Sequence, residues 1–468
     1  MKPSSSFNQL ICQFENEWKF RKEDLMNLPE FGCLNGKVYY AYNIPGLQYH
    51  VQIYPTGMTI KNRGRTQIRF DSYYYCEPEL EIEVFIESIN FSKSYSSINA
   101  NGGGYTWKTA DFFNPKNKLF VNGELTIKVK GIIKVPRPST PIISSYICAE
   151  WKINEQDLKE QEQMEESTDD RVIFKEITVP SLPGIKLKLE FFSRKIQACS
   201  YFFIHGEPGN ETKGGAVLDY SIDSANYNEQ FSFVFGGDKY FAIRLGLTDN
   251  LLDPTKKRFF VNGVLTINLK GIFMVEKHQN DQFKTLTLTK SFALKSAWKR
   301  KNKDFLIVIG DKEIHVHKKV LLAASKSMIG NKETFDNKMV INDFPYKIVD
   351  IAVKLIYGKS VMLKSSLEDM FLLFHFGDRY RIQAIMDMIE KCLIREISPV
   401  NVVYLLKFSS PDSNDSTNVP NLYQECVEFF IKCLKKATPI YAAESLGEEF
   451  LESMFLKSIL SNFTDLIN

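Results

Sequence analysis

The only two histidines that lie close together in this sequence are His315 and His317, and imidazoles are common metal ligands. On a β-strand, residues i and i+2 project from the same face, so this pair could bind one metal ion. No cysteine or acidic cluster accompanies the pair, and His317 stands where a helix is expected to begin. We therefore expect no metal site at these histidines and no bound cofactor elsewhere in the chain.

No catalytic motif is recognisable in the sequence. The glycine triplet at 102–104 is not followed by a helix that carries Lys-Ser/Thr, so it does not predict a phosphate-binding loop. A GxSxG nucleophile turn and an HExxH zinc motif are both missing from the sequence. Isolated Ser, Asp and Cys residues stand in no pattern that would orient a base against a nucleophile. These observations predict a non-catalytic protein.

The chain is rich in aromatic residues, with 36 Phe and 21 Tyr. Most of them must belong to a hydrophobic core. A few fall where expected strands meet loops: Tyr105, Trp107, Phe231, Tyr240 and Phe241. Exposed aromatic side chains at the edge of a sheet suit the binding of an extended peptide, because main-chain pairing supplies affinity and aromatic pockets supply selectivity. For any single one of these residues, core packing is the favoured interpretation.

The balance of charge argues against nucleic acid and membrane as partners. The sequence has 59 Lys and Arg against 56 Asp and Glu, a formal net charge of +3. Such a small surplus gives no general attraction to nucleic acid or to an anionic membrane. The basic run at 299–303 is short and lacks interleaved aromatic residues, so a solvated helix end is favoured over a nuclear-import or nucleic-acid patch.

The sequence predicts a cytoplasmic or nuclear protein. No apolar run approaches the ~20 residues of a membrane span, and the first residues lead into no signal-peptide core. The eight cysteines are scattered without a CxxC pair. Without an export signal, we expect them to be reduced and mostly buried.

An internal duplication organises the first two thirds of the 468 residues. The segment FVNGELTIKVKGI at 120–132 returns as FVNGVLTINLKGI at 260–272. Two further pairs keep the same order: PGL at 45–47 with PGI at 183–185, and EWK at 17–19 with EWK at 150–152. Blocks that recur in one order at nearly one offset predict two homologous domains of about 130 residues each.

The duplicated part has the periodicity of β-strands. Segments such as HVQIYP and LTIKVKGIIKV alternate apolar with polar side chains, and Asn-Gly turns stand at 35, 122 and 262. Many short strands with turns between them predict two antiparallel β-sandwiches. The acidic, Gln-rich segment 155–170 is expected to be a solvated loop between the first two strands of the second copy.

The last third of the chain has a different pattern. FLIVI at 305–309 and EIHVH at 313–317 form a predicted hairpin, and helical patterns continue from there to the end. The fold class is therefore multidomain: two antiparallel β-sandwiches, then an α/β domain and a C-terminal helical extension.

Four segments of this last third carry a family resemblance. HKKVLLAAS at 317–325 contains a His-Lys-x-x-Leu-x-Ala-x-Ser pattern, and VINDFP at 340–345, LIYGK at 355–359 and DRYRI at 378–382 follow it. With these segments, the stretch from 304 to 393 resembles a BTB (POZ) domain. The two sandwiches resemble MATH (meprin and TRAF homology) domains through the EWK openings, the IYP strand and the closing LTI strand.

A MATH domain followed by a BTB domain resembles the substrate adaptors of cullin-based ubiquitin ligases, and a tandem MATH pair is similar to the nematode branch of this MATH–BTB family. The resemblance implies a homodimer that binds protein substrates or peptides through MATH domains and a cullin through the BTB domain. It also implies four segments: MATH domain 1 at 8–137, MATH domain 2 at 145–278, the BTB/POZ domain at 286–395, and a BACK-like helical extension at 396–468.

The resemblance further implies the site residues. The segment FSFVFGGDKYF resembles the groove-forming segment of MATH domains, which implies a peptide-binding role for Phe231, Lys239, Tyr240 and Phe241. In the first copy, Gly104 and Tyr105 match the same groove, whereas Gly103 stands where the family has a groove Trp.

The dimer interface is implied in the same way. BTB domains of this family dimerise through a helix before the domain and the first helix inside it. Leu294, Ala297 and Val320 fall at these places and are apolar, as a two-fold contact requires.

One departure from the family leaves the partner open. Cullin-binding members carry a hydrophobic-x-Glu element in the loop before the IND strand, and the matching loop here, IGNKETFDNKMV, has none. Two hypotheses therefore stand: an adaptor that recruits a cullin ubiquitin ligase, or a dimeric peptide-binding scaffold without cullin binding. A hydrolytic enzyme that uses a MATH module for targeting is disfavoured, because the chain has no catalytic motif.

Overall fold

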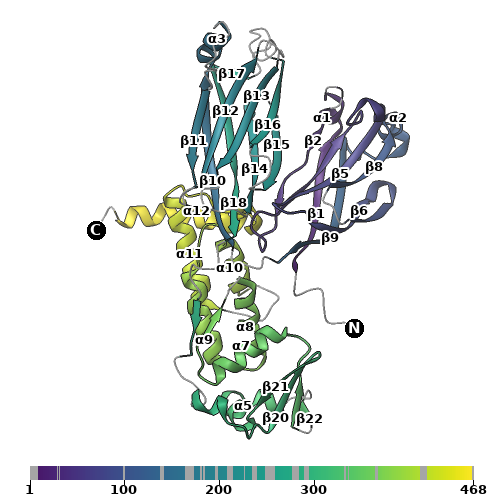
Figure 1. The fold of residues 1–468 in the computed structure, drawn as a ribbon. Coiled ribbons are helices and arrows are strands. Elements are labelled where there is room, and N and C mark those ends of the chain that lie inside the picture. Colours follow the sequence, from purple (N-terminus) through teal and green to yellow (C-terminus); the bar gives the residue numbers. More distant parts are fainter. Residues whose placement is uncertain are drawn as a thin grey trace. The chain divides into compact units, whose positions relative to one another are not determined.

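The structure is a computed structural model of the whole chain. It describes residues 9–28, 30, 32–97, 101–137, 142–163, 173–179, 182, 185–194, 199–207, 214–225, 227–234, 240–247, 259–276, 284–288, 295–330, 334–335, 337–363, 367–411 and 419–465. The chain forms two compact units (Figure 1). The β unit consists of Gln9–Arg137 and Ile143–Glu276, and the C-terminal unit contains Lys277–Asn468.

The first β repeat of the β unit consists of two antiparallel sheets. One sheet has the strand order β1 (Gln9–Arg21), β9 (Glu124–Pro136), β6 (Glu79–Ile86), β7 (Phe91–Ser97). The other has the order β2 (Leu34–Asn35), β4 (Gln48–Tyr54), β5 (Arg65–Tyr73), β8 (Asn101–Lys108), with β3 (Tyr39–Tyr40) also paired to β4. Its short helices are α1 (Lys22–Met26), η2 (Ile60–Asn62), η3 (Glu87–Ile89), α2 (Thr109–Phe112) and η4 (Pro115–Asn117).

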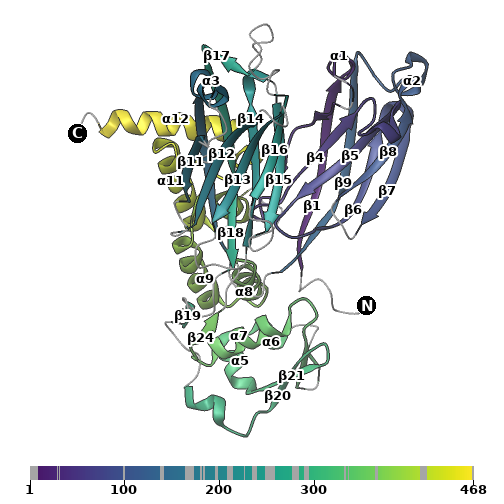
Figure 2. The same cartoon turned by 45° about the horizontal axis from the view of Figure 1, so that its top comes forward.

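The second β repeat has the same topology (Figure 2). One sheet runs β10 (Ile142–Asn154), β18 (Val264–Glu276), β14 (Gly214–Ile222), β15 (Tyr227–Val234), with β17 (Phe260–Val261) paired to β18. The other runs β11 (Ile173–Thr178), β12 (Lys186–Arg194), β13 (Cys199–Glu207), β16 (Tyr240–Leu247), and the short helices are α3 (Glu155–Gln163) and η5 (Asp223–Ala225). The repeated strand order confirms the internal duplication and the antiparallel β architecture.

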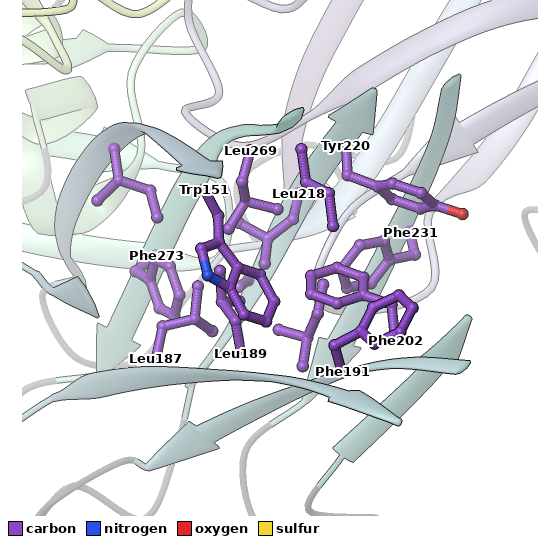
Figure 3. Packing of buried hydrophobic residues seen from close by; sticks show 14 of the residues in the cluster. Trp151, Leu187, Leu189, Phe191, Phe202, Leu218, Tyr220, Phe231, Leu269 and Phe273 are labelled. Carbon is purple, nitrogen blue, oxygen red and sulfur yellow. The ribbon is translucent and has the colours of Figure 1, made fainter. Parts of the chain in front are cut away.

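The core of the second repeat lies between its two sheets. Trp151 is 5% exposed and packs among side chains of both sheets, such as Leu187 and Phe202 from one and Leu218 from the other (Figure 3). These side chains come from alternate positions of their strands, so each sheet presents one apolar face inward. Burial of these apolar faces is what stabilises the sandwich.

Segment 155–170 is not simply a loop, and this prediction was wrong for its first half. Residues Glu155–Gln163 form helix α3, and the residues from 164 to 170 lie outside the described part of the chain. The helix is fixed at its start because the backbone N–H of Glu155 donates to the carbonyl oxygen of Gly263 at 2.9 Å, and Leu158 is 1% exposed. A single buried leucine in a polar segment is too weak a pattern to predict a helix.

The C-terminal unit begins with an α/β domain. Its sheet has the order β21 (Lys312–Val316), β20 (Phe305–Ile309), β23 (Lys338–Val340), β22 (Thr334–Phe335), with β20 and β23 parallel. A separate ladder joins β19 (Lys284–Leu286) to β24 (Val361–Leu363). The helices of this domain are η6 (Lys295–Lys299), α5 (Lys318–Ala324), α6 (Ser327–Gly330), α7 (Tyr346–Ile356), α8 (Leu367–Arg379) and α9 (Gln383–Arg395).

Helices continue to the end of the unit, as the sequence predicts. They are α10 (Val402–Ser409), α11 (Pro420–Lys435), η7 (Ala443–Leu446) and α12 (Glu448–Asp465). In the part of the chain that the structure describes, no helix combines the length and the apolar character needed to cross a lipid bilayer.

Candidate functional site

The His-Lys-x-x-Leu-x-Ala-x-Ser pattern fixes helix α5 in the C-terminal unit. The hydroxyl of Tyr357 lies 2.8 Å from Nδ1 of His317 and accepts the backbone N–H of His317 at 2.7 Å. Asp304 Oδ1 accepts the backbone N–H of Lys318 at 2.8 Å, and this hydrogen bond holds the pKa of Asp304 below its ordinary value. Its carboxylate therefore satisfies an open N–H group in the first turn of α5.

The last residue of the pattern fixes the end of α5. The Ser325 hydroxyl donates to the carbonyl oxygen of Tyr380 at the end of α8, and it accepts the backbone N–H of Ser327 at 3.1 Å. The signature residues thus join α5 to the segments before β20, after α7 and after α8. These hydrogen bonds shape the domain.

The histidine pair does not meet further metal ligands. His315 is exposed on β21, whereas His317 is half-buried against Tyr357. Across the described ranges, no group of three His, Cys, Asp or Glu side chains is placed to hold a metal ion.

The predicted dimer residues fall on two elements of the C-terminal unit. Ala297 is half-buried in η6, Val320 is half-buried in α5, and Leu294 lies outside the described residues. Helix α5 also exposes Leu322, an apolar side chain that is 42% exposed. The dimer contact stays a prediction.

The predicted groove residues of the second repeat divide between core and edge. Phe231 lies on β15 with 4% exposure, and its ring centroid is 6.2 Å from that of Tyr220 in the core. Tyr240 and Phe241 lie on β16, which is the end strand of its sheet and pairs with β13. Lys239 lies outside the described residues.

The first repeat places Gly104 and Tyr105 on β8, the end strand equivalent to β16. Tyr105 is 7% exposed, and its hydroxyl donates to the backbone carbonyl of Lys93 at 3.2 Å. Tyr240 and Phe241 of the second repeat and Gly104 and Tyr105 of the first therefore share one topological place, an end strand of the second sheet of each repeat. An end strand offers main-chain groups to an extended peptide.

A buried polar cluster of the β unit was missed by the sequence analysis. Gln48 and His50 on β4 are 0% and 1% exposed, and Nε2 of Gln230 on β15 donates to Oε1 of Gln48. Burial lowers the pKa of His50 to about 4, although Gln230 offsets part of this effect. No pattern in the sequence indicates this cluster, because polar residues at alternate positions of a strand are also typical of a solvated face.

The cluster borders a cavity of about 640 Å³ within the β unit. Its wall combines residues of both repeats: Asn35, Gly36, Val38 and His50 from the first, and Cys148, Ala149, Glu150, Asp219, Tyr220, Ser221, Asp223, Asn228, Glu229, Gln230, Asn268, Leu269 and Lys270 from the second. The repeats also meet directly, because the Asn35 side-chain amide donates to the side-chain oxygen of Asn228 at 3.0 Å.

Comparison with known families identifies one domain of the C-terminal unit. Residues 294–397 match the family model of the BTB/POZ domain. The chain therefore contains a BTB/POZ domain, which is a module of protein–protein interaction and dimerisation.

Comparison with whole proteins adds no relative. No curated protein matches the sequence. Two solved structures, described as the triple jelly roll fold and turret assembly in an archaeal virus and as the atomic structure of Sulfolobus turreted icosahedral virus, align at 9% identity over 57% of this chain. The alignments cover 82% and 83% of the viral chains with a TM-score of 0.10, which carries no argument about fold or function.

Proposed function

We propose that this chain is a non-catalytic adaptor that dimerises through its BTB/POZ domain and holds peptides of protein substrates on its β repeats. The observation that carries the proposal is the match of residues 294–397 to a dimerising interaction module, on the same chain as a duplicated β-sandwich. We further propose that the two repeats are MATH (TRAF-like) domains at 8–137 and 145–278, followed by the BTB/POZ domain at 286–395 and a BACK-like extension at 396–468. Such an adaptor would act in the cytoplasm or nucleus.

Dimerisation would use helix α5 and the segment that contains η6. Val320 is half-buried and Leu322 is 42% exposed on α5, so this short helix presents apolar surface that a two-fold partner could cover. Two peptide sites on one dimer would raise the effective concentration of the second contact, which makes weak peptide binding useful.

The mass of the full chain in solution tests the dimer. Light scattering should give twice the 54.0 kDa of one chain. Val320→Glu should give 54.0 kDa, because it places a charge in the apolar contact. Lys319→Glu is the matched control, since Lys319 is its exposed neighbour on α5, and this variant should stay dimeric. A wild-type chain that is monomeric at every concentration would contradict the proposal.

Peptide binding is proposed for the end strand β16. Its residues Tyr240 and Phe241 end the segment that resembles a MATH groove, and β16 pairs on one side with β13. Affinity capture with wild type and with Tyr240→Ala plus Phe241→Ala tests this place. The double variant should lose the wild-type partners, whereas Phe174→Ala, which removes a 59% exposed aromatic ring at the other end strand β11, should keep them. Identical partner lists for all three proteins would contradict a peptide-binding groove at β16.

The second step of the adaptor would be recruitment of a cullin ubiquitin ligase. The alternative, a dimeric peptide-binding scaffold without cullin binding, is favoured by one observation: the loop 329–340 carries no hydrophobic-x-Glu element. A pull-down of purified full-length chain with the N-terminal domain of a cullin separates the two. Retention of the cullin supports the ligase adaptor, and a dimer that retains no cullin supports the scaffold.

A further inference from the structure

The cavity of the β unit is lined mainly by polar side chains. It lies where the polar face of the β10–β18–β14–β15 sheet meets strands β2 and β4 of the first repeat. On β14 and β15, Asp219 and Gln230 line the cavity, whereas their neighbours Leu218 and Phe231 belong to the core. The cavity therefore borders the hydrophobic core, to which Tyr220 and Leu269 of its wall belong, and it is separate from the groove proposed on β16.

The wall carries an excess of negative charge. It contains four carboxylates, from Glu150, Asp219, Asp223 and Glu229, and one ammonium group, from Lys270. His50 adds no charge at neutral pH, because burial lowers its pKa to about 4. A positively charged ligand is thus the class that this wall would attract.

The carboxylates differ in their partners. Glu150 forms an ion pair with Lys152 at 2.7 Å, and Asp223 accepts hydrogen bonds from the side chains of Ser221 at 2.7 Å and Asn268 at 3.1 Å.

Glu229 has only neutral partners. It accepts hydrogen bonds from the hydroxyls of Tyr220 at 2.7 Å and Tyr227 at 3.3 Å. Among the residues that the structure describes, no cation forms an ion pair with Glu229. Its charge is therefore available to a cationic ligand.

The wall also contains buried polar atoms without partners. Gln230 raises the pKa of His50 through a side-chain interaction, but Oε1 of Gln230 and both ring nitrogens of His50 have no partner with good hydrogen-bond geometry, although the two residues are 9% and 1% exposed. A buried polar group without a partner costs about 1–3 kcal/mol, so a site that keeps such groups is expected to have a ligand or water for them. At neutral pH one ring nitrogen of His50 is an acceptor, as is Oε1 of Gln230.

We propose that this cavity binds the guanidinium group of an arginine residue in a basic peptide. A guanidinium is a planar cation with five donors and no acceptor, which suits a wall where Glu229, Gln230 and His50 present free acceptors. An ammonium group offers only three donors and is more strongly hydrated, so lysine is expected to bind more weakly. The inference deepens the proposed function by naming a second peptide contact, and it does not depend on the groove at β16.

A pair of small ligands tests the charge requirement without changing the protein. Calorimetric titration of the full chain with N-acetyl-L-arginine N-methylamide should show saturable binding. The citrulline analogue has nearly the same shape but no charge, and it should bind at least about tenfold more weakly, as expected for the loss of a charge-assisted hydrogen bond. No saturable binding of the arginine derivative, or equal binding of the two ligands, would overturn the proposal and leave a cavity that holds water only.

A pair of variants locates the site. Glu229→Gln keeps an acceptor for Tyr220 but removes the charge, so it should weaken arginine binding about tenfold. Glu176→Gln removes one charge from the exposed ion pair with Lys186 on the same unit, and it should leave binding unchanged. Arginine binding that is unchanged in Glu229→Gln would contradict this site. Since Tyr240→Ala plus Phe241→Ala should keep arginine binding, failure of the groove and failure of the cavity are distinguishable.

Discussion

The two β repeats have equivalent hydrophobic cores, but one outer face of the sheets differs between them. Trp18 and Trp151 occupy equivalent strands, β1 and β10, with 2% and 5% exposure. The turn at Asn122 and the turn at Asn262 both have φ of 51°, and each following glycine accepts a backbone hydrogen bond from the first residue of a short helix. Duplication has therefore preserved the core and the turns that set the strand register.

The outer faces of β4 and β12 contrast at matching positions. His50, 1% exposed on β4, corresponds to Lys188 on β12 at the 138-residue offset of the PG turns. Lys188 forms an ion pair with Glu190 at 2.6 Å, and His205 lies 2.8 Å from the same carboxylate. One face is thus covered by the other repeat, while its counterpart keeps the ion pairs of an exposed strand. Close packing constrains the core residues of both repeats, whereas the residues on their outer faces are free to diverge.

The largest expected effect tests whether the two interiors are equivalent. Trp18→Ala and Trp151→Ala should each lower the free energy of unfolding of the β unit by about 3–5 kcal/mol, because each leaves a cavity in a packed core. Urea denaturation followed by circular dichroism measures the loss. Phe174→Ala, at a 59% exposed position, is the control and should cost less than about 1 kcal/mol. A small loss for one tryptophan alone would break the equivalence.

The next effect tests the contrast between His50 and Lys188. An unfolded histidine has a pKa of about 6.5, whereas the buried His50 has a pKa of about 4, so the unfolded state binds the extra proton between these values. The contribution of His50 to the free energy of unfolding is fully present above about pH 6.5. It falls as the pH drops towards 4, by about 3 kcal/mol in total.

Urea denaturation between pH 7 and pH 4 measures the slope of the free energy of unfolding against pH, for the wild type and for His50→Phe. The variant cannot titrate at this position, so it should lose that part of the pH dependence. Lys188→Met at the matching position should keep the part of the slope that comes from His50, because it leaves the buried His50 unchanged. Any change in slope should come from Glu190, since Lys188 helps to lower the pKa of its carboxyl. Parallel curves for wild type and His50→Phe would show that burial of His50 does not control acid stability.

Close approach between strands gives a smaller effect in both repeats, and at Gly271 the φ of 159° adds backbone strain. A Cβ atom at Gly131 would lie 2.3 Å from the carbonyl oxygen of Glu81, and one at Gly271 would lie 2.3 Å from that of Val217. Gly131→Ala and Gly271→Ala should each reduce the free energy of unfolding by about 1–3 kcal/mol through overpacking. Thermal denaturation of both variants measures it, and a tolerated alanine at one position would show that the β9–β6 and β18–β14 contacts differ.

The turn glycines supply the control for this pair. Gly123 and Gly263 have φ of 82° and 76°, and no heavy atom lies within 4 Å of an added Cβ. Gly123→Ala and Gly263→Ala should therefore show only the strain of a left-handed backbone, about 1–2 kcal/mol.

The smallest effect concerns the exposed ion pairs of the second repeat. Lys188→Met should change the free energy of unfolding at pH 7 by less than about 1 kcal/mol, because exposed ion pairs contribute little. Addition of salt should shrink the difference between variant and wild type further. A loss as large as that of a core substitution would mean that this face of β12 is not solvated.

The repeats, the strand class and the α/β-to-helical C-terminal part could be predicted because their signals are local. The FVNG turns and the HKKVLLAAS segment keep recognisable residues at short spacing. Helix α3 escaped prediction because its anchor, the carbonyl of Gly263, lies 108 residues away from Glu155. The core position of Phe231 agrees with the interpretation favoured for single aromatic residues on these strands, whereas the groove role that the family resemblance implies for it stays a prediction.

The sequence alone determined that this chain has two copies of one β framework and a BTB-like segment, because local alternation, turn residues and signature spacing specify strands and helices. Only the tertiary structure decided that the polar side of β4 is buried: Gln48 meets Gln230, which lies 182 residues further along the chain. Alternation tells which residues share a face of a strand, but what covers that face depends on contacts between segments that are remote in sequence.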